Sequence, residues 1–141
     1  MDTLITKLQT AYDKAMLHAK ARENPEVIID YFPPIGNGNG YTSLELFMAS
    51  FGSCVGSTLL TLLRYRMKKS IDGLSVEVKG SLRQEHPKAL QHILLLLKIK
   101  GKDLTKIEAI EALNIAENTM CPVWAMIKGN VTVDVEIEIN E

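Results

Sequence analysis

Residues 43–58 read SLELFMASFGSCVGST and decide how this 141-residue chain folds. Thr42 precedes the stretch and Glu45 follows three residues later, which is the spacing of a reciprocal capping box at the start of a helix. No charged residue occurs between Glu45 and Arg64. We therefore expect a helix from Thr42 to about Lys69 that is apolar nearly all round and buried at the centre of the fold.

A membrane span is the competing interpretation of this apolar stretch. Seven of the 18 residues between the two charges are Ser, Thr or Gly, and that length is at the lower limit for a transmembrane helix. The small residues around position 54 instead favour close packing against another element of a soluble core, because small side chains let two backbones approach. We favour the soluble interpretation.

The chain before this helix predicts one more helix, a strand and a loop. Residues 3–22 carry apolar side chains at three- and four-residue spacings, which indicates an amphipathic helix: Leu4, Leu8, Tyr12, Ala15 and Ala19. Residues 27–32 are a β-branched and aromatic run typical of a strand. The GNGNG run at 36–40 lacks the lysine of a phosphate-binding loop, so we expect an irregular loop there.

The chain after the central helix predicts two strands, a helix and a last strand. Runs at 74–82 and 90–100 alternate as an antiparallel pair, and the second is apolar on both faces, so we expect a cover on each side. Asp103 can cap a helix that extends through Met120. Strict alternation over 131–139 predicts a final strand. The expected order is αβαββαβ, an α+β fold in one domain spanning residues 1–141.

Composition excludes several classes of function. With 16 basic and 17 acidic residues the net charge is −1, so no general field would attract nucleic acid or an acidic membrane surface. The amino terminus is charged and lacks the pattern of a signal peptide, and we expect a cytoplasmic protein. The three histidines lack metal-site spacing, which disfavours a bound metal and a Ser-His-Asp hydrolase.

The two cysteines are the residues most able to carry chemistry. Cys54 lies inside the predicted buried helix, where a cysteine is usually an inert small hydrophobe. Cys121 precedes Pro122, a residue favoured at the first helical position, so its sulfur would cap a short helix whose amides stabilise a thiolate. Trp124 would either shield this sulfur or fill the core. The residues by themselves leave two interpretations open, packing cysteines or a redox pair.

Residues 43–58 and the AENTMCP run at 116–122 resemble the OsmC/Ohr family of thiol-dependent peroxidases. The strands and helices over 27–141 follow in the family's order and spacing. The resemblance implies an OsmC-like fold, with a long cysteine helix packed on an antiparallel sheet, in an intertwined homodimer with its sites at the subunit interface.

The resemblance also implies a reaction. Cys54 would attack a hydroperoxide and become a sulfenic acid, and Cys121 would close a redox-active disulfide. A dithiol, either a lipoyl-protein or a small thiol, would restore both thiols, so no bound cofactor is required. The alternative within the family is a small-ligand-binding or stress protein without efficient peroxidase activity.

Two further residues are candidates through the resemblance. Peroxidase members use an amino-terminal arginine to lower the pKa of the attacking thiol, whereas here a helix over residues 1–24 is expected to replace the family's first strands. Arg22 is the only arginine before Cys54 and is the candidate by chain order. The family's helper glutamate often stands where this chain has Leu44, and Glu45 matches the neighbouring position found in many OsmC-like members.

Overall fold

The computed structural model describes residues 2–11 and 14–141, which form two compact units divided between Phe47 and Met48. The first unit contains a three-stranded antiparallel sheet in the order β1-β2-β3. Its strands are β1 (Lys7–Thr10), β2 (Leu17–Lys20) and β3 (Val27–Ile29). The helix α1 (Ser43–Thr61) begins in the last residues of this unit.

The helix predicted at the amino terminus is wrong, because Lys7–Thr10 and Leu17–Lys20 are strands that pair antiparallel. Leu8 lies opposite Ala19 and Ala19 opposite Val27, so apolar side chains assigned to one helix face share one face of a sheet. A four-residue spacing fits both structures, since four is a multiple of the strand period of two. Tyr12 and Asp13, also assigned to that helix, lie outside the described residues.

A buried carboxylate organises the loop that follows β3. Asp30 is 1% exposed and accepts backbone N–H bonds from Tyr31, Asn37 and Asn39 at 2.8, 3.1 and 3.1 Å. A Cβ at Gly36 would collide with this carboxylate, so the loop requires glycine there. The Asn and Gly residues of the GNGNG run therefore form a defined turn around Asp30.

We call the three backbone hydrogen bonds to Asp30 the Asp30 clamp. They predict that the stability of this loop depends on pH. Hydrogen bonds from the backbone, that of Asn39 foremost, hold the pKa of Asp30 below its ordinary value. A carboxylate with a lowered folded pKa stabilises the fold above its unfolded pKa of about 3.9. That stabilisation is lost as the pH falls through the lower folded value.

We expect Asp30→Asn to speed amide exchange of residues 31–41 at neutral pH, because the three backbone donors lose their anionic acceptor. Hydrogen exchange followed by mass spectrometry would measure this, with the exposed Asp72→Asn as the matched control. Wild type should show the same increase only below about pH 4. Unchanged protection in Asp30→Asn would contradict the clamp.

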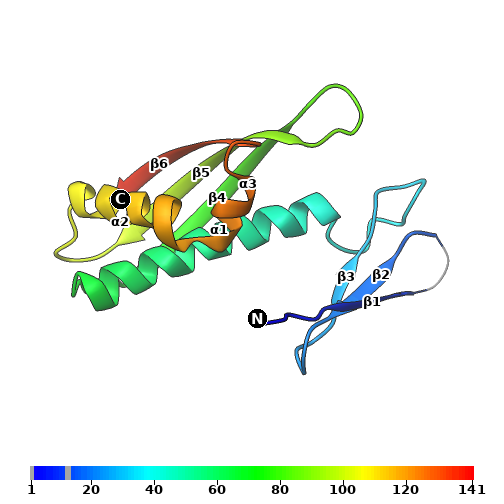
Figure 1. Ribbon diagram of the computed structural model, residues 1–141, viewed down its shortest axis with the longest axis horizontal. Coiled ribbons are helices and arrows are strands. Elements are labelled where there is room, and N and C mark those ends of the chain that lie inside the picture. Colours follow the sequence, from blue (N-terminus) through cyan, green and yellow to red (C-terminus); the bar gives the residue numbers. More distant parts are fainter. Residues whose placement is uncertain (1, 12–13) are drawn as a thin grey trace. The chain divides into compact units, whose positions relative to one another are not determined.

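The second unit contains a three-stranded sheet in the order β4-β5-β6, with its helices on one face (Figure 1). The expected antiparallel pairing of β4 with β5 is confirmed, and β6 is parallel to β5. The elements of this unit after α1 are η1 (Leu62–Arg66), β4 (Gly73–Leu82), β5 (Leu90–Lys100), α2 (Lys106–Ile115), η2 (Ala116–Met120), α3 (Pro122–Ile127) and β6 (Thr132–Ile139).

The core lies between the helices and one face of this sheet. The buried face of β5 consists of Ile93, Leu95, Leu97 and Ile99, each at most 1% exposed. A Cβ on Gly52 would stand 2.8 Å from Val78, and one on Gly56 would stand 3.0 Å from Leu74. The small residues of α1 therefore bring this helix close to β4, as their sequence pattern predicts.

The second face of β5 lacks the expected cover in the part of the chain that the structure describes. Leu94 and Leu96 are half-buried there. Their cross-strand neighbours are charged, Lys79 and Asp134 beside Leu94, Glu77 and Glu136 beside Leu96. The aliphatic parts of such side chains can shield an apolar neighbour while their charged ends stay in water.

The helix α1 is also less buried than its composition predicts. Phe51, Val55 and Leu59 are 0% exposed, but the opposite face is open and small, with Ser50, Ser53, Ser57 and Thr61 exposed. Three of these hydroxyls donate to carbonyls of α1 itself. Among the described residues, the continuous helix formed by α1 and η1 is long and apolar enough to span a membrane. This combined helix ends at Arg66, whereas the sequence predicted an end at about Lys69.

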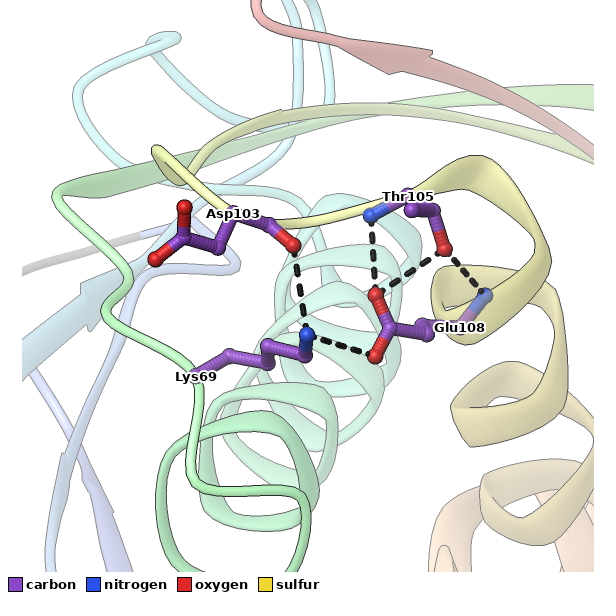
Figure 2. A network of polar contacts seen from close by, with 4 residues as sticks. All are labelled: Lys69, Asp103, Thr105 and Glu108. Carbon is purple, nitrogen blue, oxygen red and sulfur yellow. Dashed lines mark hydrogen bonds and ion pairs between the residues drawn. The ribbon is translucent and has the colours of Figure 1, made fainter.

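A polar network ties the end of η1 to the start of α2 (Figure 2). Lys69 Nζ lies 2.7 Å from Glu108 and donates to the carbonyl of Asp103 at 3.2 Å. The bond from Lys69 foremost lowers the pKa of Glu108. Thr105, not Asp103, caps α2, because Thr105 and Glu108 form a reciprocal capping box.

Candidate active site

The structure brings the sulfur atoms of Cys54 and Cys121 to 2.7 Å from each other, although 66 residues separate them along the chain. Cys54 lies in the middle of α1, and Cys121 lies between η2 and α3. Both cysteines are free thiols. A disulfide is about 2.05 Å long, so the sulfurs need to approach by only about 0.65 Å to bond.

The local chain explains why Cys121 points at α1. The wide turns of η2 end with the amide of Cys121 donating to the carbonyl of Ala116 at 2.9 Å. Pro122 then starts α3, and the carbonyl of Cys121 accepts from Ala125 at 3.1 Å. The predicted position of Cys121 at the N-cap of a short helix is confirmed.

The expectation that this helix end yields a stabilised thiolate at Cys121 is wrong. Burial, followed by the hydrogen bond to Cys54, raises the pKa of Cys121 to about 11, against the opposing effect of the backbone amides of Trp124 and Val123. Cys121 is 2% exposed. Desolvation of an anion therefore outweighs the helix end, and Cys121 is a neutral thiol near pH 7.

The two sulfurs differ in what they offer to a solute. Cys54 is partly exposed, whereas Cys121 is buried and donates its S–H toward Cys54. A nucleophile must be reachable, so Cys54 is the better placed of the two to meet a small molecule, and Cys121 is placed to react with whatever forms on Cys54. This geometry fits two-step thiol chemistry better than packing alone.

Phe51 of α1 and Trp124 of α3 form an aromatic pair. The rings of Phe51 and Trp124 meet edge to face, with centroids 5.5 Å apart and an interplanar angle of 88°. Trp124 is 3% exposed and so fills the core, one of the two roles expected from the sequence. Phe51 was not a candidate from sequence, although its position three residues before Cys54 was an available signal.

Arg22 and Glu45 lie in the first unit, and the sulfur pair is formed by the second unit alone. Arg22 follows β2 in the left-handed region of backbone conformation, with φ of 55°. Glu45 accepts the backbone N–H of Thr42 at 2.8 Å, and the Thr42 hydroxyl accepts that of Glu45 at 3.2 Å. The predicted capping box is confirmed, and the catalytic roles of both residues stay predictions.

Comparison with known proteins identifies the family of this chain. A sequence profile described as OsmC-like protein matches residues 36–136. No curated protein matches the sequence.

Several solved structures share the fold. An OsmC-like protein from Mycoplasma pneumoniae superposes with a TM-score of 0.84 at 16% identity, over 99% of both chains. An organic hydroperoxide resistance protein from Elizabethkingia anophelis gives 0.77 at 21% identity, covering 99% of this chain and 98% of that one. The organic hydroperoxide resistance protein OhrB of Bacillus subtilis gives 0.67 at 23% identity, over 97% of this chain and 98% of that one. The profile covers more than half of the chain, which therefore belongs to the OsmC-like protein family.

Proposed function

We propose that this protein is a cysteine-based peroxidase that reduces organic hydroperoxides in oxidative stress defence. The observation that carries the proposal is the 2.7 Å separation of two free thiols, one partly exposed and one buried. Some structural neighbours are organic hydroperoxide resistance proteins, which supports the choice of substrate class.

In the proposed first step the thiolate of Cys54 attacks the distal oxygen of the hydroperoxide. The O–O bond breaks, the alcohol leaves with a proton, and Cys54 becomes a sulfenic acid. The Cys121 sulfur then attacks the Cys54 sulfur, and the sulfenic oxygen leaves as water with the proton of Cys121. A dithiol finally reduces the disulfide by exchange.

The two cysteines have different roles because Cys121 is buried and Cys54 is partly exposed. The raised pKa of Cys121 keeps it protonated until the sulfenic acid forms, so that it can donate toward Cys54 during the first step. Arg22 remains our candidate for the cation that activates the attacking thiol, and Glu45 for a residue that orients it. Chain position and family resemblance are the grounds for both assignments.

We further propose a cytoplasmic homodimer that uses a lipoyl-protein or a small thiol as reductant and needs no bound cofactor. The exposed face of α1 supports the dimer, because three of its four hydroxyls donate within the helix and its small side chains permit close approach of a second helix. The near-neutral net charge of −1 gives no reason to expect nucleic acid or an acidic membrane surface as partner.

A stoichiometric titration tests the proposed chemistry. One equivalent of cumene hydroperoxide should consume both thiols of each chain, release one equivalent of alcohol, and leave a protein lighter by two hydrogen atoms. Mass spectrometry and thiol counting measure this, with hydrogen peroxide run in parallel to define substrate class. Two thiols remaining after an excess of cumene hydroperoxide would exclude the proposal.

A second candidate function is the binding of a small apolar ligand without efficient peroxide reduction. A groove of about 250 Å³ between α1 and β4 favours it, lined by Gly52, Gly56, Leu74, Val76 and Val78 among others. Native mass spectrometry of the purified protein would detect a retained ligand. A ligand-free protein that also turns over peroxide would exclude this alternative.

A further inference from the structure

We propose that Phe51 and Trp124 are positioning residues that keep the Cys54 and Cys121 sulfurs aligned while the disulfide closes. Their contact would make closure faster than oxidation of Cys54 by a second hydroperoxide. This inference rests on the proposed function and adds to it two residues that act through the cysteines rather than on the substrate.

The geometry is a matched pair of contacts between the same two elements. Phe51 lies three residues before Cys54 on α1, and Trp124 lies three residues after Cys121 in the first turn of α3. Helix positions three apart are neighbours on one face. The ring contact at 5.5 Å and the sulfur contact at 2.7 Å therefore join α1 to the start of α3 at adjacent points.

The sulfur contact and the ring contact together restrict a rotation of the start of α3 that the sulfur contact alone would allow. A single sulfur contact leaves the start of α3 free to turn about it, and Cys121 follows the wide turns of η2 rather than a regular α-helix. The rings are 0% and 3% exposed, so surrounding side chains hold them. Edge-to-face rings prefer a defined mutual angle, and this second contact restricts how far Cys121 can swing away from Cys54.

The products formed from oxidised Cys54 report how well the two sulfurs are aligned. The sulfenic acid of Cys54 has two competing fates. Attack by Cys121 forms the S–S bond and releases water, whereas a second hydroperoxide transfers an oxygen atom to give sulfinic acid and another alcohol. The first reaction is intramolecular and depends steeply on geometry, while the second depends on peroxide concentration.

The test compares Phe51→Leu and Trp124→Leu, which remove a ring, with Trp124→Phe, which keeps one. Increasing cumene hydroperoxide is added, and mass spectrometry measures the concentration at which half of Cys54 is sulfinic acid. We expect that concentration to fall at least about tenfold in the two ring-removing variants and to stay close to the wild-type value in Trp124→Phe. Wild-type values in both ring-removing variants would overturn the proposal.

A core variant separates positioning from general stability. Leu59 is 0% exposed on the same helix but has no part in the ring contact. Leu59→Ala should destabilise the fold while leaving the peroxide threshold unchanged. An equal fall in Leu59→Ala would show that loss of any core side chain produces the effect, and would overturn the proposal.

A peroxide-free measurement keeps this inference distinct from the proposed function. Equilibration in glutathione redox buffers gives the effective concentration of the two thiols. We expect at least about a tenfold lower value in Phe51→Leu and Trp124→Leu than in wild type. If wild type fails to react with peroxide, the proposed function fails alone, and equal effective concentrations in all variants would overturn the positioning role.

Discussion

Replacement of Cys54 by serine is expected to lower the turnover of cumene hydroperoxide at least about 100-fold, to the background of the dithiol alone. A serine hydroxyl is a weak nucleophile unless a base activates it, and the hydrogen-bond partner of the Cys54 sulfur is the buried thiol of Cys121 rather than a base. The measurement is loss of hydroperoxide over time with dithiothreitol as reductant. Retained turnover in Cys54→Ser would end the proposed mechanism.

Two further variants make this experiment specific to position. Ser53→Cys in the Cys54→Ser background restores a thiol to α1 but rotates it by about 100° around the helix axis, so turnover should remain lost. Cys121→Ser should still react with one equivalent of peroxide to give sulfenic acid on Cys54, and a second equivalent should convert it to sulfinic acid. Restoration of turnover by Ser53→Cys would mean that any cysteine on this helix suffices.

The parts of the fold set by short-range interactions could be predicted from the sequence. The capping box of Thr42 with Glu45 and the turn that starts at Pro122 each depend on residues within a few positions, and both are present. The first hairpin could not be separated from a helix, because Leu8 gains its strand partner Ala19 only through pairing across a turn. The parallel pairing of β6 with β5 is likewise set by distant contacts.

In the candidate site, too, some features could be predicted from the sequence and others depend on the folded chain. The positions of the two cysteines could be predicted through family resemblance, and the structure places their sulfurs in contact. The protonation of Cys121 could not, because its raised pKa comes mainly from burial, which only the folded chain produces. Phe51 could have been noted for its place three residues before Cys54, but only the folded chain brings its ring against Trp124.

Replacement of Leu95 by alanine is expected to reduce the free energy of unfolding by about 3 kcal/mol, because Leu95 is 0% exposed at the centre of the sheet and a cavity would remain. Leu96→Ala, on the half-buried face of the same strand, should cost less than about 1 kcal/mol. Urea denaturation of both variants measures this difference. Equal losses would contradict the open second face of β5 and show that another surface covers Leu96 in solution.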